Sequence, residues 1–230
     1  MFDVLIDNKS LKLQGFLTEK RPPIPTAKRK TITSTALSSD GAVYRDTDFF
    51  EDVEIEISFN FLANEDNWHD HLRLFRSMIL NGKTLMFSDD MHFFRRIKSV
   101  EIGDCDRPVR QIGRVKVKFV VDAYEYSVSG ARFIKDPKDY AFNRYAKCRP
   151  IYKIIGGGMA ELTVNGYRCQ VSTPGTIYID TEKHLAYGED GQNLNANTNA
   201  DFDRLFLMNG MNEISITGGR LEVKPNWRSI

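Results

Sequence analysis

The 230-residue sequence predicts a mainly β protein with two domains and one α-helix. Three observations lead to this class. Residues 52–61 alternate between apolar and polar side chains over the length of a long strand. One stretch further along the chain has apolar residues at helical spacing. Beyond residue 147, short apolar runs recur between turn residues, a spacing typical of a small β-sandwich.

A basic, proline-rich segment precedes the long strand. Arg21, Pro22, Pro23 and Pro25 lie within a stretch that is also rich in Lys and Arg. Proline has no backbone N–H to donate to a sheet ladder, so it is tolerated mainly at sheet edges. We therefore expect residues 21–30 to form an exposed arm or an edge segment.

The strand at residues 52–61 has two chemically different faces. Val, Ile and Phe occupy every second position, whereas Glu54, Glu56 and Ser58 lie between them. Successive side chains of a strand point to opposite faces of its sheet. We expect the apolar face in a core, and the polar face against solvent or a partner.

The helix is predicted between Asn64 and Gly82. Asn64 is a suitable N-cap, the two acidic residues after it suit the positive end of the helix dipole, and Gly82 suits the position after the last turn. Apolar residues recur at spacings of four, three and four, namely Trp68, Leu72, Phe75 and Ile79. This continuous stripe predicts a helix that lies against a sheet.

Two further strand patterns follow the helix. Residues 84–87 and 92–100 bracket a polar turn, as in a β-hairpin, and residues 115–121 alternate again. The periodicity then fades into aromatic, charged and Gly- or Pro-interrupted sequence as far as Lys147. We therefore expect the domain boundary near Lys147.

This boundary gives domains of residues 1–147 and 148–230. In the second domain, Asn165-Gly166 is the strongest hairpin signal in the chain, because both central positions of such a turn require a positive φ. The expected strands are 150–155, 160–164, 167–171, 176–179, 213–216 and 220–223.

The composition and motifs do not indicate an enzyme, a metal site or a bound cofactor. The formal net charge is +1, so no global field attracts nucleic acid or an anionic membrane. The three cysteines are far apart and lack zinc-ligand spacing. His69 and His71 lie about 200° apart around the predicted helix, which prevents them from sharing one metal. We expect no cofactor and no catalytic residues.

Two other stretches have the composition of a ligand-binding loop, but the spacing or context of their residues does not match any known loop of that kind. The glycines at 156–158 are followed by a strand pattern, so no helix N-terminus is available to hold a phosphate. Residues 190–203 are rich in Asn and Asp, but their spacing matches no calcium loop. We expect a corner or bulge at the glycines and a solvated loop at 190–203.

In order along the chain, these features resemble those of the distal tail proteins of siphophages that infect Gram-positive bacteria. The first landmarks are the RPPIP segment at 21–25, the later turn at Asp40-Gly41, and the alternating strand 52–59 leading to the helix with Trp68. The later ones are residues 82–90, ending in FSDD, with the strands after them, and the C-terminal series 150–155, 164–166, 177–180, 206–212 and 225–228. Together the landmarks span nearly the whole chain.

The resemblance implies a fold and a structural role. Residues 1–147 would be a β-sandwich domain with one helix and a hairpin, which closes into a hexameric ring, single or stacked. The ring would leave a channel through which DNA passes without specific binding. Residues 148–230 would be a galectin-like or carbohydrate-module-like β-sandwich, short for that class.

The resemblance also implies partners and a location. The hub would contact the tail-tube protein, a tail-tip protein and a receptor-binding protein, and it would not contact a membrane. It would be assembled in the host cytoplasm and reside in the tail tip of the virion. For the ring contact we predict Arg21, Pro22, Pro23 and Pro25 together with Glu54, Glu56 and Ser58.

Two alternatives remain open on the sequence. The second domain could read host cell-wall polysaccharide, in which case Tyr187 and Trp227 are the first candidates for an aromatic platform. The chain could instead be a tail-tube protein, although such a protein would normally lack the second β domain. A third hypothesis, that the chain is a cell-wall hydrolase, is not supported by any catalytic motif in the sequence.

Overall fold

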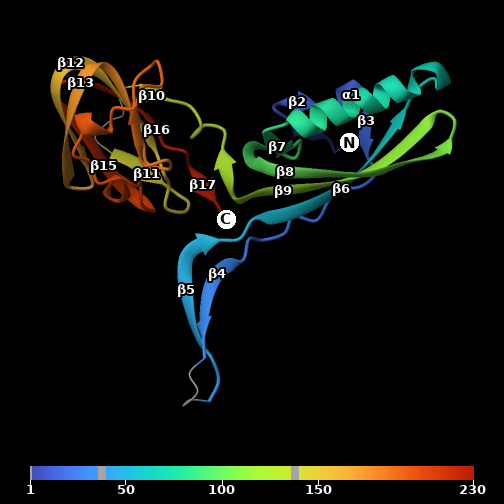
Figure 1. Ribbon diagram of the computed structural model, residues 1–230, viewed down its shortest axis with the longest axis horizontal. Coiled ribbons are helices and arrows are strands. Elements are labelled where there is room, and N and C mark those ends of the chain that lie inside the picture. The colour runs from blue at the N-terminus through green and yellow to red at the C-terminus, as the bar shows by residue number, and fades with distance from the viewer. Residues whose placement is uncertain (1, 36–39, 136–139) are drawn as a thin grey trace. The chain divides into compact units, whose positions relative to one another are not determined.

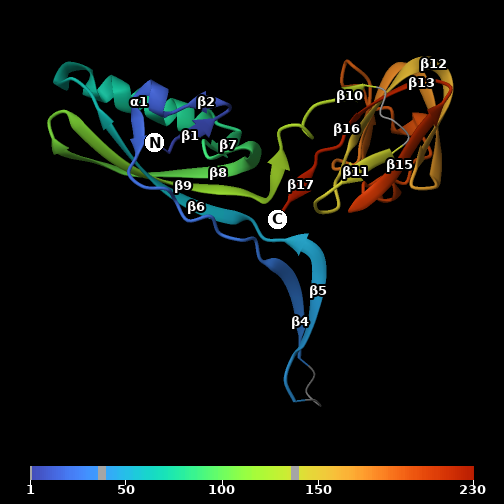
Figure 2. The ribbon, with the colours of Figure 1, turned by 180° about the vertical axis from the view of Figure 1, so that it is seen from behind.

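The computed structural model describes residues 2–35, 40–135 and 140–230. The chain divides into two units, one of Met1–Glu125 with Ile230 and one of Tyr126–Ser229. Each unit is built on strands, and the described residues contain one α-helix, α1, in the first unit (Figures 1 and 2). The predicted fold class, mainly β with one helix, is confirmed.

The first unit contains one large sheet, one helix and a separate two-stranded sheet. In the large sheet the strands follow the order β2-β1-β7-β8-β9-β6-β3, whereas β4 and β5 pair only with each other. The elements are β1 (Val4–Ile6), β2 (Lys9–Ser10), β3 (Phe16–Thr18), β4 (Arg29–Ser34), β5 (Val43–Phe50), β6 (Val53–Leu62), α1 (Trp68–Asn81), β7 (Thr84–Phe87), β8 (Asp90–Val109) and β9 (Ile112–Ser127).

Helix α1 covers one face of the large sheet (Figure 1). The four residues of its predicted stripe are all buried, and they are Trp68, Leu72, Phe75 and Ile79. The Phe75 ring lies 4.9 Å from that of Phe16 and 5.3 Å from that of Phe59, between centroids. Strand β6 supplies the sheet side of this core, because its odd-numbered residues from Val53 to Phe61 are buried. The alternation predicted for this strand is confirmed.

The ends of the helix differ from the prediction. A 3-10 turn at Glu65–Asn67 follows Asn64, and α1 begins only at Trp68. Gly82 has a φ of −62°, so it does not adopt the left-handed conformation of a typical helix-ending glycine. A Cβ at Gly82 would collide with Cγ2 of Ile6 on β1. The glycine is therefore needed for close packing of the helix end against the sheet.

The division between the units lies at Glu125, earlier in the chain than the boundary expected near Lys147. Two short strands explain the difference. β10 (Ile134–Lys135) pairs with β16 and β11 (Tyr140–Asn143) pairs with β15, both in the second unit. Edge strands this short carry no readable periodicity, so the sequence between 124 and 147 does not reveal that these strands pair within the second unit.

The second unit is a strongly bent sheet. Its long hairpin consists of β12 and β13, paired from Ile151↔Asp180 to Val164↔Tyr167. The first part of β12 pairs with β16, and the last part pairs with β15. The remaining elements are β12 (Ile151–Val164), β13 (Tyr167–Asp180), β14 (Leu185–Tyr187), β15 (Gly210–Thr217), β16 (Arg220–Lys224) and β17 (Arg228–Ser229).

The glycines at 156–158 form the corner of this bend. The strands expected at 150–155 and 160–164 are one continuous strand, β12, that changes partner at the glycines. Opposite them on β13 stand Pro174 and Gly175, and both Gly158 and Gly175 have a positive φ. The bend lets one hairpin enclose a core of its own, around Tyr152, Leu162, Val171 and other buried residues.

The turn predicted at Asn165-Gly166 is confirmed. Asn165 has a φ of 49° and Gly166 a φ of 81°, which are the left-handed values that a two-residue hairpin turn requires. None of the helices in the described ranges is long and apolar enough to span a membrane.

Candidate functional site

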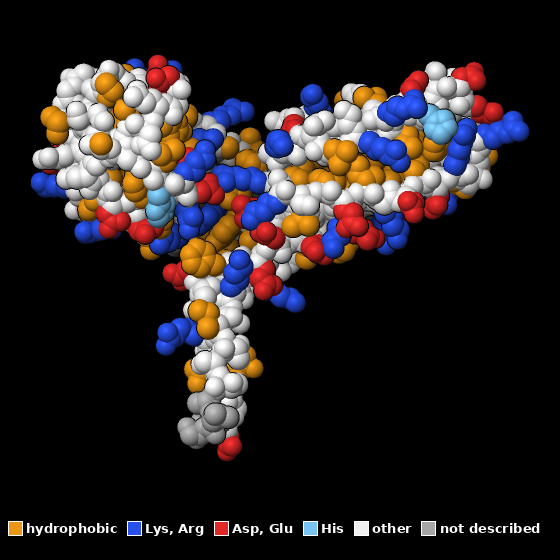
Figure 3. Space-filling view, in the orientation of Figure 1, with side chains coloured by type: hydrophobic (Ala, Val, Ile, Leu, Met, Phe, Trp, Pro, Cys, Tyr) orange, Lys and Arg blue, Asp and Glu red, His pale blue; other side chains and the backbone are white. Residues whose placement is uncertain are grey.

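Strands β4 and β5 form an arm that projects from the first unit (Figures 1 and 2). We define the arm as the described residues between Arg29 and Phe50. β4 is exposed along its whole length, and β5 is exposed at all but two positions. Four large apolar side chains of the arm lie in solvent (Figure 3): Ile32 (60% exposed), Val43 (63%), Tyr44 (71%) and Phe49 (58%).

An arm of this kind is not stable on its own contacts. A two-stranded hairpin is at best marginally stable in water, and this arm has no buried apolar residue of its own. The register places Ile32 and Val43 on one face of the hairpin and Tyr44 on the other, so apolar side chains are exposed on both faces. The arm therefore has the properties of a segment that is completed by another molecule.

The proline-rich segment lies along its own unit. Pro22 is buried, and Ala27 belongs to the core that contains α1. Arg21 forms an ion pair of 2.8 Å with Asp89, at the turn between β7 and β8. Pro23 and Pro25 are exposed and half-buried, respectively. The segment leads the chain from the sheet to the base of the arm, and the projecting part begins only at Arg29.

The polar face of β6 carries alternating charges that pair with the neighbouring strand β9. The Glu54 carboxylate lies 2.8 Å from Nζ of Lys118, and the Glu56 carboxylate lies 3.6 Å from Nζ of Lys116. Ser58 stands opposite Lys116 in the ladder. Positive and negative side chains are intermixed on this unit (Figure 3). The face has a dense but nearly balanced charge.

A small cavity lies where β7, β8 and the end of β9 meet. Its volume is about 60 Å³, and it is lined by Ile24, Leu85, Met86, Phe87, Phe93 and Phe94 together with Arg21, Asp90, Arg95 and Glu125. The lining is thus mainly apolar, with four charged residues among the ten.

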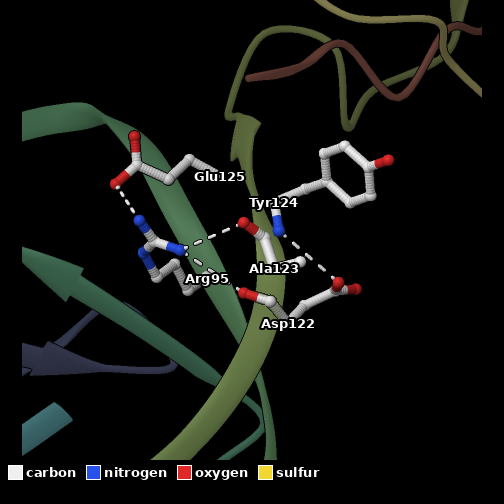
Figure 4. A network of polar contacts seen from close by, with 5 residues as sticks. All are labelled: Arg95, Asp122, Ala123, Tyr124 and Glu125. Carbon is white, nitrogen blue, oxygen red and sulfur yellow. Dashed lines mark hydrogen bonds and ion pairs between the residues drawn. The ribbon is translucent and has the colours of Figure 1, made fainter. Parts of the chain in front are cut away.

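Arg95, one of the residues that line the cavity, has its guanidinium held by a network of polar contacts (Figure 4). Arg95 is 5% exposed, and its Nη2 donates to Oε1 of Glu125 at 2.8 Å. Its Nη1 is within 3.4 Å of the carbonyl oxygens of Asp122 and Ala123. Nε is buried and has no hydrogen-bond partner. A buried N–H group of a cation without an acceptor is costly, so Arg95 carries a local energetic penalty in the folded chain.

The two glycan candidates of the second unit are engaged in packing. The Tyr187 ring stacks on that of Tyr178 with centroids 5.2 Å apart and planes 9° apart. Burial, followed by the nearby Asp180 carboxylate, raises the pKa of Tyr187. Trp227 is half-buried against Gly130, where a Cβ would fall 2.6 Å from the Trp227 backbone nitrogen. One face of each tyrosine ring is covered by the other, so the pair does not form a flat platform.

The thiols lack the properties of catalytic nucleophiles. Burial raises the pKa of Cys148, and it raises the pKa of Cys169 to about 11. Burial also raises the pKa of Cys105, which lies only partly inside. All three thiols therefore stay protonated at neutral pH, whereas a nucleophilic cysteine needs a lowered pKa.

The histidines lie apart from any metal-ligand cluster. His71 packs between Phe16 and Phe61, at 4.8 and 5.6 Å between ring centroids, and His69 packs edge-on against Trp68 at 5.0 Å. Among the described residues, no group of three His, Cys, Asp or Glu side chains is arranged to hold a metal ion.

The Asn-rich loop uses its side-chain oxygens to fold itself. Oδ1 of Asn195 accepts a hydrogen bond from the Ala186 backbone at 2.6 Å, and Oδ1 of Asn199 accepts one from Gln170 at 2.8 Å. Asn193 caps the backbone N–H of Asn195 at 2.9 Å. Because these oxygens are occupied by backbone donors, they serve the loop conformation.

Comparison with known proteins identifies a solved structure with a similar fold but no matching sequence family. No family model matches the chain, and no curated protein matches it. Among solved structures, the Dit protein (gp 19.1) of SPP1 matches with a TM-score of 0.67 at 15% identity. The match covers 97% of each chain, and that protein is described as a paradigm of the hub adsorption apparatus in phages that infect Gram-positive bacteria.

The match extends over both units of the chain. At 15% identity the similarity lies in the path of the backbone and not in shared side chains. The chain therefore has the fold of the SPP1 Dit protein, and the resemblance seen in the sequence is confirmed at the level of the fold.

Proposed function

We propose that this chain is a structural subunit of a bacteriophage tail tip, and that its copies close into a hexameric ring. The observation that carries the proposal is the arm, which exposes Ile32, Val43, Tyr44 and Phe49 on a hairpin with no core of its own. The matching fold of a hub adsorption protein supports the same role.

A projecting arm suits a ring because it makes a head-to-tail contact. The arm of one copy and the surface that receives it on the next copy are different patches of the molecule, which is the heterologous type of interface. Such contacts generate a closed ring when the rotation between copies closes. The predicted interface residues Arg21, Pro23 and Pro25 belong to the segment that leads to the arm, and we include them in the proposed contact.

The polar face of β6, with Glu54, Glu56 and Ser58, is the surface that we assign to the ring contact, and the near-neutral charge of the chain suits a ring channel through which DNA passes. Each lysine contact with a phosphate adds affinity and must be released for DNA to move. In this sheet the carboxylates of Glu54 and Glu56 already accompany Lys118 and Lys116. Charges that are already paired in this way would let DNA pass without holding it.

We assign the second unit, with its galectin-like or carbohydrate-module-like sandwich, to contacts outside the ring. The partners would be the tail-tube protein and a tail-tip or receptor-binding protein, with the hub in the virion and its assembly in the host cytoplasm. The match over both units favours a hub over a tail-tube protein, which would need no second unit. We assign no catalytic role to the chain.

The proposal is tested by the mass of the purified protein in a dilution series. Light scattering should give a species near six times the 26.4 kDa chain, and negative-stain images should show closed rings. An arm variant with Ile32, Val43, Tyr44 and Phe49 all changed to Ser should remain at the mass of one chain. Deleting residues 21–30 would be a poorer test, because it also removes Pro22 and Ala27 from the interior.

A matched control variant loses the same number of exposed apolar side chains, but at positions outside the arm. Leu13, Leu62, Leu80 and Met159 are 85, 69, 58 and 61% exposed, and changing these four to Ser should leave the ring intact. A wild-type chain that stays at 26.4 kDa at every concentration and forms no rings contradicts the proposal.

A further inference from the structure

We propose that the arm is a folding switch for assembly: its β4–β5 ladder is only partly formed in the free chain and forms fully when a neighbouring copy covers it. The inference rests on the proposed ring and deepens it, because it says what controls the closing of the ring. It concerns the folding state of the arm and not the number of copies, so the two proposals can fail separately.

The two strands of the arm depend on each other. Among the described residues, β4 and β5 pair only with each other, and neither joins the large sheet. The regular part of their ladder runs from Thr31↔Asp46 to Ser34↔Val43, and the register shifts between Thr31 and Arg29. A single two-stranded hairpin is at best marginally stable in water. The ladder of the arm therefore needs support from outside the two strands.

Burial within the chain does not provide that support. Ile32 and Val43 lie on one face of the arm and Tyr44 on the other, and all three side chains are more than half exposed. Strand β6 of the large sheet, by contrast, buries every second side chain. Fixing the backbone of each residue costs conformational entropy, which the burial of apolar surface normally offsets. On the arm this offset is largely missing.

The polar side-chain contacts of the arm lie near its base. Arg29 and Asp46 form an ion pair of 3.5 Å, and both side chains are more than half exposed. Oγ1 of Thr47 donates a hydrogen bond of 2.6 Å to the carbonyl oxygen of Lys30. Exposed ion pairs contribute little to stability. The outer part of the arm, from Ile32 onward, is thus held mainly by its own backbone ladder.

A neighbouring copy would supply what the free arm lacks. Covering Ile32, Val43 and Tyr44 removes their apolar surface from water, which is the main favourable contribution to both folding and association. A segment that folds on binding uses part of the contact energy to order itself, so it binds more weakly than a preformed surface of the same size. The arm therefore restrains assembly at low concentration and becomes rigid once the ring has closed.

Hydrogen exchange of the backbone amides tests the folding state of the arm directly. In wild-type chains too dilute to assemble, the amides that pair β4 with β5 should exchange much faster than those that pair β6 with β9, because a marginal hairpin opens at little cost in free energy. In the assembled ring both groups of amides should be protected. Trypsin gives a second measurement, since cleavage after Lys30 or Arg45 should be rapid in the free chain and slow in the ring.

A disulfide across the hairpin tests the link between folding and assembly. Ser34 and Val43 stand directly opposite each other, so the double variant Ser34→Cys/Val43→Cys can close the arm in the free chain. The oxidised form should assemble at a concentration at least about tenfold lower than the same chain when reduced, because the contact no longer has to order the arm. The change Cys105→Ala in every variant removes the native thiol that is not buried.

The matched control is a disulfide in a hairpin that contributes to a buried core. Thr163 and Arg168 stand opposite each other on β12 and β13, so oxidising Thr163→Cys/Arg168→Cys should leave assembly unchanged. Equal assembly of the oxidised and reduced arm variant would overturn the folding switch while leaving the ring standing. Amides of the arm as protected as those of β6 in the free chain would do the same. A wild type that stays monomeric at every concentration would overturn the ring proposal and the switch with it.

Discussion

Nδ2 of Asn165 donates a hydrogen bond of 2.9 Å to Oδ1 of Asn212, which links a surface hairpin turn to a fully buried amide. Nδ2 of Asn212 in turn donates to the carbonyl oxygens of Ala141, Met208 and Gly210 at 2.8 to 3.2 Å. One side chain thus fastens β11, β15 and the turn between β12 and β13. This junction holds one end of the bent sheet together.

Replacing the amide of Asn212 should strongly destabilise the second unit. In Asn212→Asp a carboxylate would face three carbonyl oxygens without a donor to them, and an uncompensated buried charge costs about 3–5 kcal/mol. Urea unfolding at pH 7 should show this loss, and the loss should shrink as pH falls and the new carboxyl becomes protonated. Asn193→Asp is the matched control, because Asn193 uses only its oxygen and a carboxylate keeps that acceptor.

The buried hydroxyl of Tyr152 should contribute measurably to stability. It donates a hydrogen bond of 2.7 Å to the carbonyl of Leu205, and both residues are inaccessible to solvent. Tyr152→Phe leaves that carbonyl without its donor, so unfolding in urea should become easier by about 1–3 kcal/mol. Tyr167→Phe removes a hydroxyl that accepts from the exposed backbone of Asp201, and its effect should stay below about 0.5 kcal/mol. Equal losses would contradict this account.

A methyl group at Gly113 should destabilise the first unit. Gly113 on β9 stands opposite Phe61 on β6, and a Cβ there would collide with the Phe61 ring. Because Phe61 is 2% exposed and packed on all sides, overpacking should cost about 1–3 kcal/mol in Gly113→Ala. Gly157→Ala is the control, since a Cβ at Gly157 meets no atom within 4 Å. Thermal unfolding of the two variants tests this prediction. A Gly113→Ala chain as stable as the wild type would contradict it, because it would show that β9 can shift to make room for the methyl group.

Stability should fall in alkaline solution because of a buried thiol. Burial raises the pKa of Cys169 from its ordinary 9.0 to about 11. The folded chain therefore holds the thiol proton more tightly than the unfolded chain does. The contribution of Cys169 to stability is fully present below about pH 9 and is lost as pH rises through about 11. Unfolding measured from pH 8 to 11 under reducing conditions should have a flatter pH dependence in Cys169→Ala, and an unchanged slope would contradict the assignment.

Local patterns predicted much of the fold because each depends on near neighbours in the chain. The stripe from Trp68 to Ile79 repeats with the helical period, and Asn165-Gly166 carries the backbone preference of its turn. The glycines at 156–158 predict a corner or bulge, which is confirmed, but the two separate strands predicted on either side of them are wrong, because β12 continues through the corner. A glycine can bend a strand without ending it, and only the partners β15 and β16 distinguish the two cases.

The position of the arm and the burial of Arg95 were harder to predict from the sequence than the fold. The prolines correctly indicated a segment outside the regular ladder, yet Pro22 is buried and the projecting arm begins at Arg29. No sequence signal indicated that Arg95 would be buried with an unpaired Nε, since its partners are backbone carbonyls and Glu125 at the end of another strand. The side chain of an arginine in a strand is expected in solvent unless long-range pairing says otherwise.

The sequence by itself determined the mainly β class, the position of the helix and its buried face, and the turn at Asn165-Gly166. These features follow from side-chain periodicity and backbone preference, which act over a few residues. Only the tertiary structure decided where the units divide, that the exposed arm is β4 with β5, and that a cavity lies beside Arg95. Those features arise from pairing between strands far apart in the chain, and no local pattern encodes which distant strand will be the neighbour.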